Sequence, residues 1–331
     1  MRAWLLDELT GLAALRLGEV ADPAPRTGEV VLRMHYAALN PADRYLAERQ
    51  YPAKPPLPHI LGRDGLGTVV QVGPGTAGVA VGDRRIVLRG DVGVGRAGTF
   101  AERVVVPVES LVEVPPGWEE PEAAGATLVY LTAYQALTMW GALPAASVVL
   151  VTGASGGVGV ASVQLAASMG LTVAALSRSP EKSERLRQLG ASVCLDPTVA
   201  DWRSVLKKAI EPRRVDLAID NIGGELLPEV IETLGDQGRA SLVGRLAGPV
   251  PSFNTASLFF RRIRMGGVSV GANTNAESRT GWHEVLALLA RTGARPLVDS
   301  TFPFDQLPKA FERLAKGPMG KVILRVDPQA P

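Results

Sequence analysis

An apolar run passes into a glycine-rich turn at residues 148–159, which read Val148-Val149-Leu150-Val151-Thr152-Gly153-Ala154-Ser155-Gly156-Gly157-Val158-Gly159. The run predicts a buried strand, and the uncharged residues 157–169 that follow predict a helix. Gly156 allows close approach of a pyrophosphate to the backbone, and Gly159 allows the helix to pack closely on the strand. Ala154 replaces the usual first glycine. The stretch is therefore interpreted as a dinucleotide-binding fingerprint, with a purely structural strand-turn-helix as the alternative.

Strand and helix patterns alternate on the C-terminal side of this turn. Strands are predicted at residues 172–176, 215–219 and 240–243, and a helix at 180–189. Such alternation is typical of a parallel sheet with helices on its faces. A further strand is expected at 267–270, followed by helices at 281–291 and 307–316 and a last strand at 322–326.

The first 120 residues have a different pattern, in which short β-branched runs alternate with Gly, Pro and Asp. They predict a domain of strands and turns. The C-terminal tail is too short to form a domain alone, so we expect it to return to this β-rich part. The predicted division is a catalytic domain of residues 1–122 and 270–331 and a cofactor domain of residues 123–269.

Composition excludes several classes of protein. The chain has 331 residues, 46% of them hydrophobic and 21% charged, with a net charge of +2, which argues against disorder and against binding nucleic acid. The single cysteine, Cys194, excludes internal disulfides. Residues 123–177 carry no charge, but turn formers divide them into pieces too short to span a membrane. No export signal is evident, and the cytoplasm is the expected compartment.

Several further motifs occur in a definite order along nearly the whole chain. They are Asn40-Pro41-Ala42-Asp43-Arg44-Tyr45, His59-Ile60-Leu61-Gly62-Arg63-Asp64-Gly65-Leu66-Gly67, Val81-Gly82-Asp83-Arg84, Leu131-Thr132-Ala133-Tyr134 and Gly320-Lys321-Val322. With the glycine turn, they resemble the medium-chain dehydrogenase/reductase superfamily, in its zinc-free quinone oxidoreductase (zeta-crystallin-like) branch. The resemblance implies an α/β fold, in which a GroES-like β-barrel catalytic domain accompanies a Rossmann domain with a doubly wound parallel sheet. The nicotinamide is then expected in the cleft between the two domains.

The residues that hold zinc in other members of the superfamily are missing. Asn40 stands in the region of the first cysteine ligand, and Gly62-Arg63-Asp64 stands where zinc enzymes have Gly-His-Glu. His59 has no partner at ligand spacing, and neither His35 nor His283 joins it. We therefore expect no metal. Without a Lewis acid, reduction of a quinone or an α,β-unsaturated carbonyl is favoured over oxidation of an alcohol.

The resemblance implies three catalytic residues, Asn40, Tyr45 and Tyr51. Asn40 can donate an amide N–H to a carbonyl oxygen, and the tyrosines can donate a hydroxyl proton or pack a flat ring. Structural roles stay open for all three, because Asn40-Pro41 is a turn former, Tyr45 can cover the barrel, and Tyr51 can pack the substrate ring. Asp43 can line the same cleft or have a buried hydrogen-bonding role, and both roles stay open.

The expected cofactor is NADPH. No acid ends the second strand of the alternating region, where Arg178 and Lys182 can instead bind a 2′-phosphate, although both can also be solvated cations. Thr132 can contact the nicotinamide amide or bond back to its own helix, and Lys321 can line the cofactor cleft or lie on the surface. The full set expected to bind the cofactor is Thr132, Ala154, Ser155, Gly156, Gly157, Val158, Gly159, Ser177, Arg178, Lys182, Asn221, Val243, Gly244 and Lys321.

The favoured function is an NADPH-dependent quinone or enone reductase acting on a small molecule. An enoyl-thioester reductase is the alternative within enzymes, and an NADPH-binding protein with weak catalysis is the alternative outside them. A homodimer is expected from the resemblance, with residues 257–260 and 268–270 supplying an apolar sheet edge. The stretch from Phe253 to Ser278 has no distinctive match, so the physiological acceptor stays open.

Overall fold

The computed structural model describes residues 1–88, 90–248, 252 and 254–330. Phe253, which opens the stretch without a distinctive match, lies outside them. The chain divides into a β-rich unit of Met1–Leu128, Asn273–Arg279 and Arg295–Pro331, and an α/β unit of Val129–Ala272 and Thr280–Ala294. These bounds differ from the predicted ones at residues 123–128, which join the β-rich unit, and at 270–272 and 280–294, which join the α/β unit.

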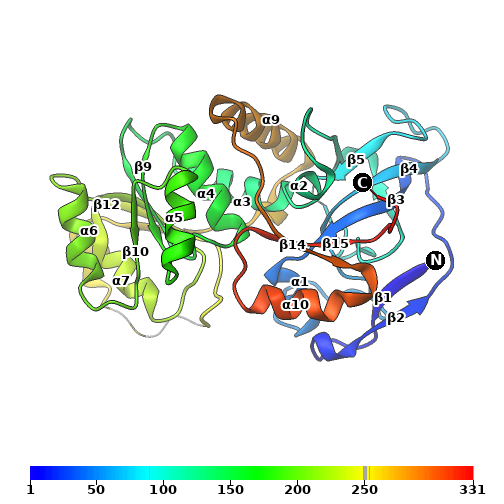
Figure 1. Cartoon of the computed structure of the whole chain (residues 1–331), viewed down its shortest axis with the longest axis horizontal. Coiled ribbons are helices and arrows are strands. Elements are labelled where there is room, and N and C mark those ends of the chain that lie inside the picture. The colour runs from blue at the N-terminus through cyan, green and yellow to red at the C-terminus, as the bar shows by residue number, and fades with distance from the viewer. Residues whose placement is uncertain (89, 249–251, 253, 331) are drawn as a thin grey trace. The chain divides into compact units, whose positions relative to one another are not determined.

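The α/β unit is built on a parallel sheet, which has six strands within the described residues (Figure 1). The strand order is β10-β9-β8-β11-β12-β13, and every adjacent pair is parallel. When the strands are renumbered from β8 as strand 1 to β13 as strand 6, the order is 3-2-1-4-5-6, which is the order of a dinucleotide-binding sheet. The strands are β8 (Val148–Val151), β9 (Thr172–Leu176), β10 (Val193–Leu195), β11 (Val215–Asp220), β12 (Leu234–Leu242) and β13 (Arg264–Gly267).

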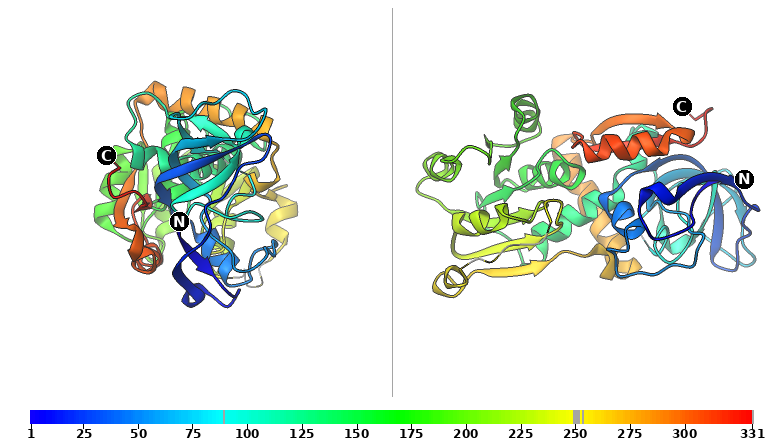
Figure 2. Two further views of the ribbon diagram at one scale, coloured as in Figure 1. Left: turned by 90° about the vertical axis from the view of Figure 1, so that its right-hand side faces the viewer. Right: turned by 90° about the horizontal axis from the view of Figure 1, so that it is seen from below.

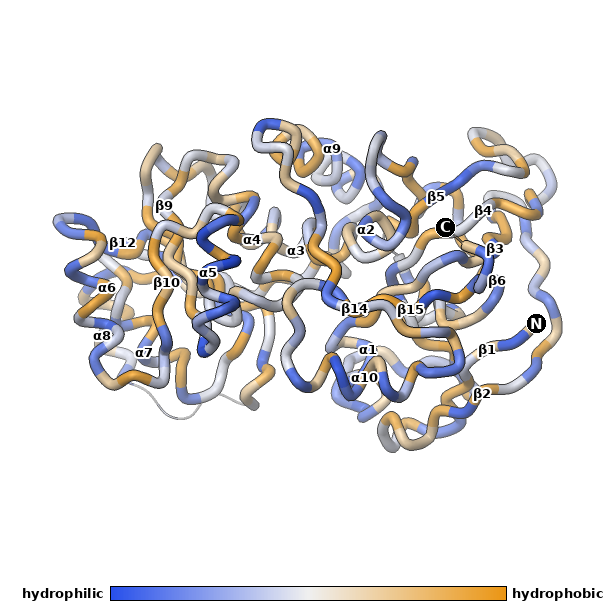
Figure 3. Tube along the Cα trace, viewed as in Figure 1, coloured by the Kyte–Doolittle hydropathy of each residue, from blue (hydrophilic) through white to orange (hydrophobic). Residues whose placement is uncertain are grey.

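Helices cover this sheet because its strands carry apolar side chains on both faces. One face packs against α6 and α7, whose Trp202 and Leu227 belong to the same buried apolar cluster as Leu150 and Leu176 of the sheet. The strands are hydrophobic along their length, whereas α5 is markedly hydrophilic (Figure 3). The helices of the unit are α3 (Thr127–Thr138), α4 (Gly157–Ser168), α5 (Pro180–Gln188), α6 (Trp202–Ile210), α7 (Leu226–Thr233), α8 (Ala256–Phe260) and α9 (Asn275–Thr292), of which α3 and α9 begin in the β-rich unit.

The β-rich unit joins the two ends of the chain in one sheet. The order β14-β15-β3-β4-β5-β7 is extended by β6, which pairs with β3. Strand β15, from the C-terminal end, lies antiparallel to β3. The right-hand view of Figure 2 shows the N and C labels close together in this unit. The strands are β1 (Arg2–Leu6), β2 (Leu15–Glu19), β3 (Glu29–Ala38), β4 (Asp64–Val72), β5 (Arg84–Val87), β6 (Arg103–Pro107), β7 (Leu111–Glu113), β14 (Val298–Pro303) and β15 (Lys321–Arg325), and the helices are α1 (Pro41–Ala47), α2 (Glu120–Ala124) and α10 (Leu307–Ala315).

The predicted return of the tail to the N-terminal part is thus observed, as is the parallel sheet. Two predicted elements were wrong in position. The strand expected at 267–270 is β13, which lies three residues earlier because Arg264–Gly267 pair with β12. The helix expected from 281 begins at Asn275. No helix among the described residues is long and apolar enough to cross a membrane.

Candidate active site

The glycine turn joins β8 to α4 in the α/β unit. Gly153 has φ of 56°, a left-handed conformation that favours glycine. A Cβ on Gly159 would lie 2.3 Å from the carbonyl oxygen of Gly153, so only glycine lets α4 start this close to the turn. A Cβ on Gly156 would meet that oxygen at an ordinary 3.5 Å. Packing within the described residues therefore does not require glycine at position 156.

The other residues of the fingerprint occupy the turn and the first turn of α4. Ala154 is completely buried, Ser155 and Val158 are partly exposed, and Gly157 is the first residue of the helix. The N-cap residue is Gly156, which has no side chain to cap the first N–H groups of α4. Backbone N–H groups at the start of a helix of this length suit an anion such as a pyrophosphate.

A buried polar cluster links the carboxyl ends of β8 and β11. The Thr152 hydroxyl donates to Oδ1 of Asp220 at 2.6 Å, and the Asn221 side-chain amide donates to the Thr152 carbonyl at 2.8 Å. Burial raises the pKa of Asp220, against the opposing effect of its hydrogen bonds from Thr152, Ile222 and Gly223.

The Asn221 side chain is the one member of this cluster with an unused acceptor. Its Oδ1 atom is buried and has no hydrogen-bond partner among the described residues, although only 7% of the residue is exposed. A buried acceptor without a donor is costly, and it lies at the sheet edge where ligands bind to parallel α/β folds. The arrangement fits a ligand that donates a hydrogen bond there. Val243 and Gly244 follow β12 at the same edge and donate backbone N–H groups to the Asp220 carbonyl.

The residues expected to choose the cofactor follow β9. Ser177 is buried, Arg178 is exposed and Lys182 is partly exposed in the first turn of α5, whose N-cap is Ser179. The Asp196 carboxylate interacts electrostatically with the Arg178 guanidinium. Two hydrogen bonds from Thr198 lower the pKa of Asp196, and the Arg178 charge lowers it further. A carboxylate thus stands near the predicted phosphate-binding arginine.

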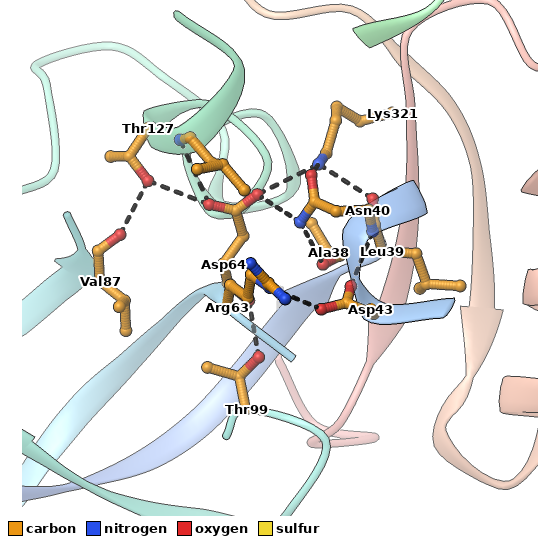
Figure 4. Close-up of polar contacts among 11 residues, drawn as sticks. Ala38, Leu39, Asn40, Asp43, Arg63, Asp64, Val87, Thr99, Thr127 and Lys321 are labelled. Carbon is orange, nitrogen blue, oxygen red and sulfur yellow. Dashed lines mark hydrogen bonds and ion pairs between the residues drawn. The ribbon is translucent and has the colours of Figure 1, made fainter. Parts of the chain in front are cut away.

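Asn40, Asp64 and Lys321 form a closed cluster in the β-rich unit (Figure 4). The Lys321 ammonium donates to Oδ1 of Asn40 at 2.7 Å, to Oδ2 of Asp64 at 3.1 Å and to the carbonyl of Leu39 at 3.0 Å. The Asn40 amide donates to Asp64 at 3.0 Å. The other Asp64 oxygen accepts from the backbone N–H of Leu128 and lies 3.2 Å from the Thr127 hydroxyl.

This cluster changes how Asn40 and Lys321 are interpreted. Lys321 is 4% exposed, so the surface alternative is wrong, and its three N–H groups all have acceptors within the protein. The Asn40 amide group, expected to donate to a substrate, is directed to Asp64 and to the Ala38 carbonyl. Both residues therefore fix the loop between β3 and α1 in this structure.

A second buried ion pair lies beside the first. Asp43 is fully buried, accepts from the backbone N–H of Asn40 at 2.9 Å and pairs with Arg63 at 3.2 Å. Burial raises the pKa of Asp43, and the Arg63 charge opposes that rise. The Arg63 guanidinium lies 4.3 Å from the centre of the Tyr51 ring. Tyr51 thus packs against a cation, and its side chain is only partly buried.

The remaining two predicted residues are placed on helices. Tyr45 lies in α1, partly buried, with the Arg44 guanidinium 5.4 Å from its ring centre. Thr132 lies in α3, also partly exposed. Sequence reasoning missed the roles of Thr152, Asp220 and Asp64. An acid at the end of a predicted buried strand was the signal available for Asp220.

Metal-ligand geometry is missing from the described residues. None of them form a group of three or more His, Cys, Asp and Glu side chains that could hold an ion. His59 is 3% exposed, and burial lowers its pKa.

Two families match the chain, each in one region. The Alcohol dehydrogenase GroES-like domain matches residues 26–116, and the Zinc-binding dehydrogenase family matches residues 157–305. The human synaptic vesicle membrane protein VAT-1 homolog is 30% identical, covering 93% of this chain and 82% of its own length. The rat quinone oxidoreductase is 28% identical, covering 98% of this chain and 97% of its own.

Solved structures of other proteins match the fold of nearly the whole chain. An NAD-dependent alcohol dehydrogenase has a TM-score of 0.90 at 28% identity, covering 99% of this chain and 100% of that one. A mycobacterial protein in complex with NADPH has a TM-score of 0.88 at 26% identity, covering 98% and 100%. The β-rich unit therefore contains the GroES-like fold, and the α/β unit has the Rossmann fold.

Proposed function

Because this chain belongs to the medium-chain dehydrogenase/reductase superfamily, in its quinone oxidoreductase branch, we propose that it is an NADPH-dependent, zinc-independent reductase of quinones or α,β-unsaturated carbonyl compounds. The family assignment makes the chain an oxidoreductase. NADPH, the acceptor and the independence of zinc are the proposed parts.

One observation carries the proposed independence of zinc. Asn40 and Asp64, at the positions that correspond to zinc-ligand motifs, both bind the Lys321 ammonium. A permanent internal cation thus lies among these side chains, where a second cation would be repelled. The acceptors that suit such a site are those whose charge can delocalise onto oxygen without a Lewis acid.

The cofactor is expected at the carboxyl edge of the parallel sheet. NADPH supplies the hydride when bound. The N–H groups at the start of α4 would hold its pyrophosphate, and the unpartnered Oδ1 of Asn221 would accept a hydrogen bond from it. Lys321 and Asp64 would keep the Asn40 loop fixed, while the Tyr51 ring, which lies over Arg63, would pack against the ring of the acceptor.

The acceptor class is tested by following NADPH oxidation with a quinone, an enone and an enoyl thioester. We expect turnover of the quinone or the enone. In Tyr51→Phe the ring remains over Arg63, so quinone kcat should change less than about tenfold, because solvent can protonate the oxygens of a reduced quinone.

Two other outcomes would contradict this proposal. Efficient turnover of the enoyl thioester, with a loss above roughly 100-fold in Tyr51→Phe confined to that substrate, would favour an enoyl-thioester reductase with Tyr51 as the acid. Binding of NADPH without turnover of any acceptor would favour a cofactor-binding protein with weak catalysis.

Cofactor choice is tested at Arg178. A hydrogen bond to a charged group is worth about 1.5–3 kcal/mol, so Arg178→Ala should weaken NADPH binding by roughly 10- to 100-fold and leave NADH binding unchanged. Removing the nearby charge in Asp196→Asn should strengthen NADPH binding several-fold. Fluorescence titration of both cofactors measures these affinities.

Arg185→Ala is the matched control, because Arg185 is an exposed arginine of α5 that pairs with Gln188. It should bind NADPH like the wild type. Equal affinity of the wild type for NADPH and NADH would contradict the assignment.

We also propose a homodimer formed through the edge of the parallel sheet. Strand β13 ends that sheet, and nearby Phe259 and Phe260 are 63% and 79% exposed with ring centres 4.4 Å apart. Large exposed aromatic side chains beside a sheet edge favour association. Light scattering at micromolar protein should give twice the chain mass, and Phe259→Ser with Phe260→Ser should give the monomer. A monomeric wild type would exclude the dimer.

A further inference from the structure

Three side chains form a hydrogen-bonded chain on the sheet of the β-rich unit. Nδ1 of His35 lies 2.8 Å from Oε2 of Glu120, and Nε2 of His35 lies 3.0 Å from the Thr68 hydroxyl oxygen. An ionised carboxylate only accepts, so the network assigns the ring proton to Nδ1 and leaves Nε2 to accept from Thr68. Hydroxyl, imidazole and carboxylate then stand in the order that activates a nucleophile.

The backbone of β3 positions this imidazole. Met34 pairs with Gly67 and Tyr36 pairs with Leu66, so His35 is the extra residue of a β-bulge. A bulge turns a side chain away from the regular alternation, and bulges are common beside active sites. The imidazole thereby lies between a strand hydroxyl and the first residue of α2.

Two of the three hydrogen-bonded side chains, His35 and Glu120, are buried. The side chains of His35 and Glu120 are 10% and 5% exposed. Nη1 of Arg84 lies 3.2 Å from Oε1 of Glu120, so the carboxylate has a partner on each oxygen. Thr68, by contrast, is partly exposed and accessible from solvent.

Positive charge flanks the hydroxyl on both sides. Arg33 on β3 and Arg84 on β5 lie directly opposite Thr68 in register, which places the three residues on one face of the sheet. Arg33 is exposed, and the Arg84 side chain is 59% exposed. Guanidinium groups beside a nucleophile can stabilise an oxygen that becomes negative during attack.

We propose that Thr68 is an acyl-accepting nucleophile, which gives this protein an esterase activity toward small activated carboxylic esters, separate from its reductase site. The Thr68 oxygen attacks the ester carbonyl carbon while His35 takes the hydroxyl proton. The bond from carbon to the leaving oxygen breaks, and His35 returns the proton to that oxygen. Water then hydrolyses the threonyl ester with His35 as the base, which releases the acid and restores Thr68.

The probe is 4-nitrophenyl acetate. The wild type should release 4-nitrophenol and carry one acetyl group on Thr68, found by peptide mass spectrometry after an acid quench. Thr68→Val, which keeps the shape and removes the hydroxyl, should lose roughly 100-fold in release rate, as expected for general-base activation, and should carry no acetyl group there. Thr68→Ser should retain both.

Thr301→Val is the matched control, since Thr301 is an exposed threonine of β14 in the same unit. It should behave like the wild type. Quinone reduction should be unchanged in all these variants, which shows that they are folded. Equal release by wild type and Thr68→Val, or acetyl groups on lysines alone, would overturn the proposal.

Discussion

Lys321→Met should destabilise the β-rich unit by about 3–5 kcal/mol, because it leaves the Asp64 carboxylate buried without its ion-pair partner. Asp64 is 1% exposed in its side chain, and Lys321 is 5% exposed. The same change releases Asn40, so quinone kcat should fall by at least about tenfold. Chemical denaturation and steady-state kinetics measure the two effects.

A double-mutant cycle separates the lost charge from the lost side chain. The variant that combines Lys321→Met with Asp64→Asn should be more stable than Lys321→Met alone, since no bare charge remains. Lys316→Met, at an exposed lysine that caps α10, should change stability by less than about 0.5 kcal/mol. A Lys321→Met variant as stable and active as the Lys316 control would contradict the role given to the cluster.

Gly156→Ala should lower the affinity for NADPH, whereas Gly159→Ala should lower the stability of the fold. At Gly156 a methyl group meets the Gly153 oxygen at an ordinary distance of 3.5 Å, and φ is −72°. The fold should therefore be kept, while NADPH affinity falls by roughly 30-fold or more, because the methyl group holds a phosphate away from the backbone. At Gly159 the methyl group would lie 2.3 Å from backbone, so about 3 kcal/mol or more of stability should be lost.

Thermal unfolding without cofactor and NADPH titration distinguish the two variants. Gly170→Ala is a control for adding a methyl group in open space, although the φ of 73° there carries its own cost. If Gly156→Ala binds NADPH as tightly as the wild type, the glycine turn is a structural feature and not a cofactor site.

The parallel sheet of the α/β unit was predictable because strand and helix patterns alternate along the sequence. Apolar runs end in polar or glycine residues at regular intervals, and right-handed crossovers then leave few topologies. The position of β13 was not predictable in this way. Arg264, Gly266 and Gly267 are poor strand formers, and they form a strand because Arg239–Leu242 on β12 offer unpaired backbone.

Site residues were predictable from the sequence only where they lie together in one continuous segment. The glycine turn is such a segment. The pairing of Asn40 with Lys321 joins residues 281 positions apart, and no spacing rule connects them. His35 has no partner at ligand spacing, and its contacts with Thr68 and Glu120 arise from a β-bulge and a helix start that only the folded chain brings together.

The most direct test of the central claim is the quinone reductase rate of protein freed of metal with 1,10-phenanthroline, with bound zinc measured by mass spectrometry. The proposal predicts NADPH oxidation within about twofold of the untreated rate and no gain on adding zinc, because no Lewis acid takes part. Loss of activity on chelation, restored by one zinc ion per chain, would contradict the assignment of Lys321 as the permanent cation of this cluster.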